Sequence, residues 1–343
     1  MIPPLHRKEL RGGNGKRMRN DGRYTMLRII AAVALLMLPA SFAAAQDYPS
    51  RPIKIVIGLP AGGGADIIAR YFADKLKGAL NQTVVVENKP GAGGNLASQA
   101  VATAEPDGYT LLFSTSNPLT GNLILYRNLP FSINDFAPVT TLGQGAFALA
   151  VKGDSPIKTL PDLTQYLKEK DGRAAYGSPT TISLAAAEVY MQAAGVKARL
   201  VRYKSSAQAL TDLKAGEIDY FFIDTTGALG PTKRGEIRLL AVTTTTRSSS
   251  FADVPTMQEL GIKDFDLSSW FGIFAPAKTP QAIRDKLEAT LNEIVRRKET
   301  ADYLQSIAID ATPGNPEALM GQVRRQTAVY KKLFDEGKLS AAD

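Results

Sequence analysis

The sequence predicts an α/β fold made of two α/β domains. Two observations support this prediction. Apolar, β-branched segments typical of strands alternate with segments of helical periodicity, and this alternation begins again after a stretch rich in loop-forming residues. The length of 343 residues has room for two compact domains, and 44% hydrophobic with 22% charged residues is typical of a soluble globular protein.

The first α/β unit has three strand patterns separated by two helical ones. In chain order, these elements are expected at residues 53–58, 66–80, 83–87, 95–104 and 109–114. Each helical segment joins two strands, and a crossover of this kind places the two strands parallel. We therefore expect a parallel sheet in this unit.

A loop-rich stretch with Pro118, Pro130 and Pro138 separates the first unit from the second. The second unit is expected to have strands at 147–151, 173–176, 199–203 and 219–223, with helices at 160–170, 182–194 and 207–215. Two more strands are expected at 239–243 and 270–275, and residues 280–338 have a helical pattern that begins at Pro280, a favourable first-turn residue. The chain therefore contains a second α/β unit.

Residues 1–45 have the pattern of a signal peptide. A basic stretch precedes the apolar run 29–38, and small residues follow as far as Ala45, after which we expect cleavage. A membrane anchor is the alternative, but residues 29–45 are interrupted by Pro39 and are shorter than the roughly 20 residues that cross a bilayer. Translation starts at Met1 or at Met26. We expect a protein exported to the periplasm of a Gram-negative cell.

The charge of the mature chain argues against a nucleic-acid partner. The signal segment has eight Lys and Arg against two acidic residues, so its removal lowers the net charge from +8 to +2. The sequence has no Cys, and its one His is His6. Ser-His-Asp and Cys-His catalysis, His/Cys zinc sites and disulfides are therefore excluded from the mature protein, and we expect no catalytic residues, metal or cofactor.

Ligands of parallel α/β sheets bind at the carboxyl ends of the strands. The loop 60–66, Pro-Ala-Gly-Gly-Gly-Ala-Asp, joins the first strand to the first helix, where its main-chain N–H groups and the helix dipole favour an anion. It has neither the Walker sequence nor the glycine spacing of a dinucleotide site. The alternative is a tight turn in which Asp66 stabilises the first helical turn and pairs with Arg70.

Three further regions follow strands of the predicted sheets. Residues 114–118 contain Thr115, Ser116 and Asn117, and a plain polar turn is the alternative. Residues 177–183 carry four hydroxyls, more than helix capping requires. Lys204 and Asp224 follow later strands. An enzyme that uses Asp66, Lys204 or Asp224 as acid, base or nucleophile is the alternative from another functional class.

Ordered motifs across the chain resemble the Bug, or tripartite tricarboxylate transporter receptor, family of periplasmic solute-binding proteins. These motifs lie at residues 48–54, 60–66, 87–95, 106–111, 253–261, 268–272 and 275–280. The resemblance implies a type II periplasmic-binding-protein fold: two α/β domains with a hinge and a central ligand cleft, joined by crossings near Gly145 and Trp270. It assigns residues 46–145 plus 271–343 to domain 1 and residues 146–270 to domain 2.

The resemblance also implies the function. A monomeric binding protein would capture a small organic carboxylate and deliver it to the integral-membrane permease subunits of a tripartite transporter. A ligand-sensing subunit for a signalling receptor is the alternative. The predicted ligand-binding residues are Leu59, Ala61, Gly62, Gly63, Gly64, Asp66, Thr115, Ser116, Asn117, Ser178, Thr180, Thr181, Ser183, Lys204 and Asp224.

The chain departs from the family pattern at several of these positions. Thr180 and Ile182 stand where the family has Gly, Ala186 where a His is usual, and Ser205 where Gly is usual; Ala65 replaces a common Thr. The pocket is therefore expected to be narrower and more apolar than is usual. The identity of the carboxylate does not follow from the sequence.

Overall fold

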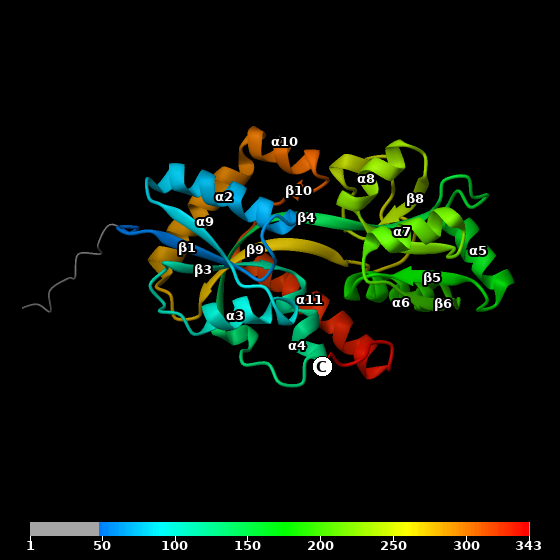
Figure 1. The fold of residues 1–343 in the computed structure, drawn as a ribbon, viewed down its shortest axis with the longest axis horizontal. Coiled ribbons are helices and arrows are strands. Elements are labelled where there is room, and N and C mark those ends of the chain that lie inside the picture. The colour runs from blue at the N-terminus through cyan, green and yellow to red at the C-terminus, as the bar shows by residue number, and fades with distance from the viewer. Residues whose placement is uncertain (1–47, 343) are drawn as a thin grey trace, which may run out of the picture. The chain divides into compact units, whose positions relative to one another are not determined.

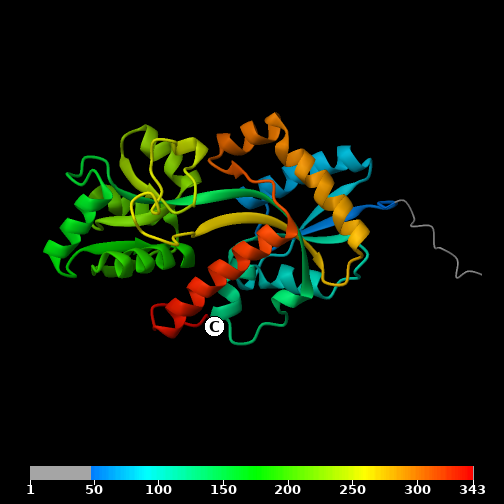
Figure 2. The same ribbon diagram turned by 180° about the vertical axis from the view of Figure 1, so that it is seen from behind.

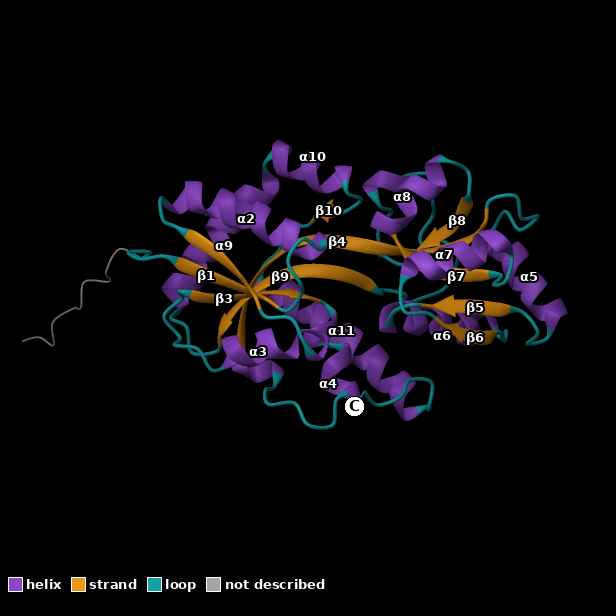
Figure 3. Ribbon diagram, in the orientation of Figure 1, coloured by secondary structure: helices purple, strands orange, loops and turns teal. Residues whose placement is uncertain are grey.

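A computed structural model describes residues 48–342, and residues 49–342 form one compact unit. The predicted signal segment lies outside the described residues. The described strands belong to a ten-stranded sheet whose main order is β2-β1-β3-β9-β4-β7-β5-β6, with β8 and β10 each paired to β4. Helices cover both faces of this sheet (Figure 3). In the part that the structure describes, no helix has the length and apolarity needed to cross a membrane.

The first half of the sheet confirms the predicted parallel unit. Its strands β1 (Ile53–Ile57), β2 (Val84–Asn88) and β3 (Thr110–Thr115) are parallel, with β1 in the middle. Helices α2 (Gly64–Leu80) and α3 (Asn95–Ala102) make the crossovers. The β1 sequence Ile-Lys-Ile-Val-Ile forms a central strand because all its side chains except that of Lys54 are buried.

The second half contains another parallel group. Its elements are α5 (Leu160–Lys170), β5 (Ala175–Ser178), α6 (Thr181–Ala194), β6 (Arg199–Arg202), α7 (Ser206–Ala215), β7 (Tyr220–Asp224), α8 (Thr225–Lys233) and β8 (Ile237–Val242). Strand β5 is parallel to both β6 and β7. These strands and the helices α5, α6 and α7 were predicted, whereas α8 was not.

Strand β4 (Phe136–Lys152) runs through both halves, beside β9 (Ser268–Pro276) in the first (Figure 1). It pairs with β9 as far as Ala146 and with β7 from Phe147 onward. The sequence predicted only residues 147–151 as strand, so the prediction of a loop across residues 136–146 was wrong. Pro138 is tolerated there because it lies at an irregularity in the pairing with β9.

Two glycines explain the close packing on β4. A Cβ atom at Gly143 would lie 2.9 Å from Ile309 Cγ2, and one at Gly145 would lie 3.0 Å from Ile309 Cδ1. Strand β10 (Asp310–Ala311) pairs with β4 beside these glycines. The glycines therefore admit a neighbouring segment and do not end the strand.

The C-terminal region is helical, as predicted, and forms α9 (Gln281–Arg296), α10 (Lys298–Ser306) and α11 (Pro316–Asp335). Figure 2 shows α9 and α11 from behind. Helix α11 packs against β4 and α4 (Gly121–Leu125) and also against α6 in the second half. The remaining short 3-10 helices are Ala92–Gly94, Asn117–Leu119, Ile133–Asp135 and Ser249–Phe251.

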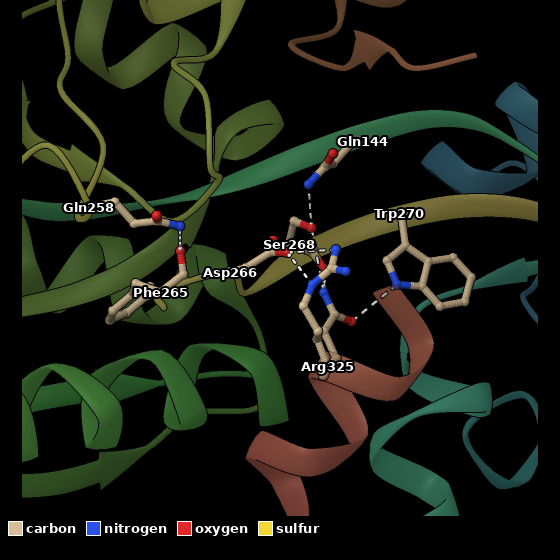
Figure 4. Close-up of polar contacts among 8 residues, drawn as sticks. Gln144, Gln258, Phe265, Asp266, Ser268, Trp270 and Arg325 are labelled. Atoms are coloured by element: carbon tan, nitrogen blue, oxygen red, sulfur yellow. Dashed lines mark hydrogen bonds and ion pairs between the residues drawn. The ribbon is translucent and has the colours of Figure 1, made fainter. Parts of the chain in front are cut away.

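The start of β9 is attached to α11 by buried polar contacts. Trp270 is fully buried, and its Nε1 donates to Gln326 Oε1 at 3.1 Å. Gln326 Nε2 donates to the Ser268 carbonyl at 2.9 Å, and Gln144 Nε2 donates to Ser268 Oγ at 2.6 Å (Figure 4). These contacts fix α11 at the place where the chain enters β9.

Candidate ligand-binding site

The Gly-rich loop joins β1 to α2, as predicted. Gly62 has φ +82°, a conformation that favours glycine, and the N-cap residue Gly63 provides no side chain to bind the first-turn N–H groups. Ala61, Gly62, Gly63 and Gly64 are exposed. The loop therefore presents main-chain donors at the positive end of a helix dipole.

Asp66 holds this loop in place. Its carboxylate is buried and accepts from the Gly62 N–H at 2.8 Å, from Arg70 Nε at 2.9 Å and from Asn88 Nδ2 at 2.8 Å. Burial raises the pKa of Asp66, but the hydrogen bonds from Arg70, Gly62 and Asn88 outweigh it and lower the pKa to about 2. Asp66 is therefore ionised at neutral pH, and Arg70 balances its charge.

Asn88 extends the same network to the end of β1. Its Nδ2 also donates to the Leu59 carbonyl at 3.0 Å, and its Oδ1 accepts from Arg70 Nη2 at 2.9 Å. The ends of β1 and β2 and the first turn of α2 are thus held together by side-chain amide and guanidinium groups. The sequence analysis did not single out Asn88, although its position in the last residue of a strand indicated this edge of the sheet.

Leu59 and Thr115 line a cavity of about 20 Å³ between the ends of β1 and β3. Gly58, Gly94 and Ser98 also line it. This volume holds about one water molecule and no organic ligand. The cavity is therefore a small recess beside the loop.

Ser116 and Asn117 lie next to this recess. The Ser116 carbonyl accepts from Thr120 Oγ1 at 2.7 Å, and Asn117 Nδ2 donates to Asn122 Oδ1 at 2.9 Å. Asn122 Nδ2 donates in turn to Asn95 Oδ1 at 2.6 Å. Asn117 Oδ1 has no hydrogen-bond partner among the described residues. The turn is thus held by a chain of amides, of which Asn122 and Asn95 are buried and Asn117 is half-buried, and the sequence analysis did not identify this chain.

Ser178, Thr180 and Thr181 line a second, larger cavity, a groove of about 490 Å³ at the ends of β5 and β6. Ser178 Oγ donates to the Thr180 carbonyl at 3.2 Å, and Thr180 Oγ1 caps α6 by accepting from the Ser183 N–H at 3.2 Å. Ser183 is fully buried, and its Oγ donates to the Phe222 carbonyl at 2.7 Å. Ser183 therefore fixes α6 on β7.

The other walls of the groove come from distant parts of the chain. Leu184 of α6, Leu125 of α4 and the C-terminal residues 339–342 line it, together with Pro179, Arg202 and Tyr203. The Ala342 N–H donates to the Leu125 carbonyl at 2.8 Å, which holds the C-terminal segment in this position. The sequence analysis missed both Arg202 and this segment.

Lys204 and Asp224 do not line the groove. Lys204 is exposed, and its main-chain N–H donates to Gln208 Oε1 at 3.2 Å. Asp224 caps α8 by accepting from the Gly227 N–H at 2.7 Å, and its second oxygen accepts from Ser206 Oγ at 3.4 Å. Among residues 48–342, no group of three or more acidic side chains that could hold a metal ion is present.

Residues 68–339 of the chain match the sequence model of the protein family described as tripartite tricarboxylate transporter family receptor. Protein BugT of Bordetella pertussis is 31% identical over 318 residues, which cover 90% of this chain and 98% of BugT. A TctC solute-binding protein from Polaromonas is 28% identical with a TM-score of 0.75, covering 84% of this chain and 99% of that one.

An R. palustris protein solved with adipate is also 28% identical, with a TM-score of 0.70, and the match covers 84% of this chain and 98% of that one. These similarities confirm the predicted type II periplasmic-binding-protein fold, with two α/β domains. The chain belongs to the tripartite tricarboxylate transporter receptor family of periplasmic solute-binding proteins.

Proposed function

We propose that this protein captures a small organic carboxylate between two closing domains and delivers it to a tripartite tricarboxylate-type membrane permease. The observation that carries the proposal is the uncapped start of α2, where the exposed residues Ala61, Gly63 and Gly64 present main-chain donors and the Gly62 N–H binds Asp66. The ionised Asp66 does not repel an anion there, because Arg70 and Asn88 already bind its oxygens. The adipate in the R. palustris relative is consistent with such a ligand.

The proposed domains are residues 46–145 plus 271–343 and residues 146–270. The change of partners along β4, from β9 at Ala146 to β7 at Phe147, supports this division. The ligand would contact the loop 61–64, Leu59, Thr115, Ser116 and Asn117 of the first domain and Ser178, Thr180 and Thr181 of the second, whereas Lys204 does not line the groove. Asp66, Ser183 and Asp224 would act by holding these loops in place.

Purified protein should be stabilised by carboxylates in a thermal-shift screen without converting them. A ligand at 100 times its dissociation constant should stabilise the folded state by about 2.7 kcal/mol. The matched amide of each carboxylate is the control, because it preserves shape and removes the charge. Stabilisation by the amides and not by the acids would contradict the proposal, and so would product formation detected by mass spectrometry.

Export should yield a periplasmic form whose N-terminus is near Gln46. We expect this form in the osmotic-shock fraction, because the segment 1–45 has a basic stretch, an apolar run and a small-residue cleavage site. Edman sequencing of that fraction measures the start. Recovery of the intact N-terminus in washed membranes would instead favour an anchored protein.

A further inference from the structure

We propose that the guanidinium of Arg202 binds a second carboxylate of the ligand, which makes this protein selective for dicarboxylates with an apolar body. This inference rests on the proposed function and assigns a specificity residue within it. Arg202 is the last residue of β6 and lines the groove with Ser178 and Thr181. No sequence pattern singled it out.

The pairing of the strands places Arg202 beside the hydroxyl-bearing loop. Ser178 and Arg202 are direct partners in the parallel register of β5 and β6, and neighbouring strands lie about 4.8 Å apart. Both residues are the last of their strands, at the edge of the sheet where ligands of this fold class bind. The cation and the hydroxyls therefore belong to one wall of the groove.

Although the charge of Arg202 acts on the Tyr176 hydroxyl, no carboxylate of the described protein forms an ion pair with Arg202. Its side chain is exposed, and none of residues 48–342 forms an ion pair or hydrogen bond with its guanidinium. By contrast, Arg234, Arg247 and Arg297 form ion pairs with Glu236, Glu259 and Glu293. A free guanidinium at the rim of a groove is well suited to a carboxylate, which it binds with two parallel hydrogen bonds.

The rest of the groove indicates the kind of ligand body that would lie beside Arg202. Leu125, Leu184 and Leu339 form an apolar part. Tyr203 also lines the groove, and its hydroxyl donates to Asp212 Oδ2 at 2.7 Å, so that this polar group is already occupied. A ligand whose aliphatic or aromatic body covers these groups would place a carboxylate at Arg202.

Arg202 is better placed for this carboxylate than Lys204, the cation among the ligand-binding residues predicted from the sequence. Lys204 lies two residues further along the chain, is exposed and is not part of the groove wall. An ammonium on a flexible stem also lacks the two-pronged geometry with which guanidinium binds a carboxylate. The two cations therefore give opposite expectations in one experiment.

The test is calorimetric titration of the full mature protein with succinate, glutarate and adipate and with the monomethyl ester of each. For the diacid that binds most tightly, we expect Arg202→Gln to weaken binding about 10- to 100-fold, the usual effect of losing a hydrogen-bonded charge pair. Binding of the corresponding monoester should change less than threefold. The preference for diacid over monoester should therefore disappear in the variant.

Two further variants are the controls. Arg199→Gln removes the same charge from the other end of β6, at an exposed residue outside the groove wall, and Lys204→Gln removes the neighbouring cation. Both should keep the preference for the diacid. Equal effects of Arg202→Gln and Arg199→Gln, or equal losses for diacid and monoester, would overturn the assignment of Arg202. Stabilisation by other carboxylates in the thermal-shift screen, with no binding of any of these diacids, would overturn it as well, whereas stabilisation by no carboxylate in that screen would refute carboxylate binding itself.

Discussion

Replacing Gly58 with alanine should lower the free energy of unfolding by at least about 1 to 3 kcal/mol and weaken ligand binding at least tenfold. The added Cβ would lie 2.6 Å from Gly94 Cα and 3.0 Å from the Gly94 oxygen. Both are main-chain atoms, which cannot move away as the end of a flexible side chain can. The end of β1 would therefore be pushed from the segment before α3, and the recess beside Leu59 and Thr115 would be distorted.

Gly78→Ala is the matched control for this substitution. Gly78 lies in α2, and a Cβ there meets no atom within 4 Å. The change should stabilise the protein by about 0.5 to 1 kcal/mol, because alanine favours a helix interior over glycine. Urea denaturation and ligand titration of both variants measure the two effects. Similar stability of the two variants would show that β1 and the Gly94 segment can separate at little cost.

The second large effect is expected from Asp66→Asn, which should remove about 2 kcal/mol of stability at neutral pH. The pKa of Asp66 is lowered from 3.8 to about 2 in the folded protein, so the folded state favours the ionised carboxylate. This contribution is fully present above the unfolded value of about 3.8 and is lost as pH falls through the folded value of about 2. The asparagine variant has no such titration.

The measurement is urea denaturation of the original protein and of Asp66→Asn between pH 7 and pH 2. The difference in free energy of unfolding between them should be constant above about pH 5 and become smaller below it. Asp74→Asn is the control: Asp74 is an exposed residue of the same helix, and its replacement should alter the free energy of unfolding by less than about 0.5 kcal/mol. If the difference in free energy of unfolding between the original protein and Asp66→Asn stays unchanged down to pH 2, the carboxylate of Asp66 does not supply this stability.

Much of the fold could be predicted because its strands are buried and carry a clear pattern. Ile53–Ile57 and Tyr220–Asp224 are β-branched or aromatic runs next to amphipathic helices, so local propensity and tertiary structure agree. The first half of β4 could not be predicted in this way. Pro138, Gly143 and Gly145 resemble loop residues until the irregular pairing with β9 and the side chain of Ile309 are known.

Helix α8 was missed for a related reason. It contains Gly227, Gly230 and Pro231, all unfavourable in helices, and its stability comes from contacts beyond the local sequence. Asp224 caps it, and Thr225 Oγ1 is within hydrogen-bond distance of the carbonyls of Ala146 and Ala308. Tertiary contacts therefore override the local preference.

The candidate site shows the same limit. Its loops could be located because they follow strands, which is a local signal. Which side chain lines a groove depends on strand register and on the path of the distant C-terminal segment. The sequence therefore did not indicate Arg202 and residues 339–342, and it predicted Lys204, which does not line the groove. The roles of Asp66 and Ser183 in holding backbone likewise depend on partners such as Asn88 and Phe222.

The buried Trp270 gives the protein an internal optical probe. It is the sole tryptophan in the whole chain, so all indole emission comes from one position at the start of β9. Its Nε1 is bound to Gln326, and emission of an indole responds to the polarity and hydrogen bonding around it. A shift in the wavelength of maximum tryptophan fluorescence on adding a ligand would therefore report a rearrangement between β9 and α11, without any attached dye. A Gln326→Leu variant supplies the reference spectrum for the same indole without that bond.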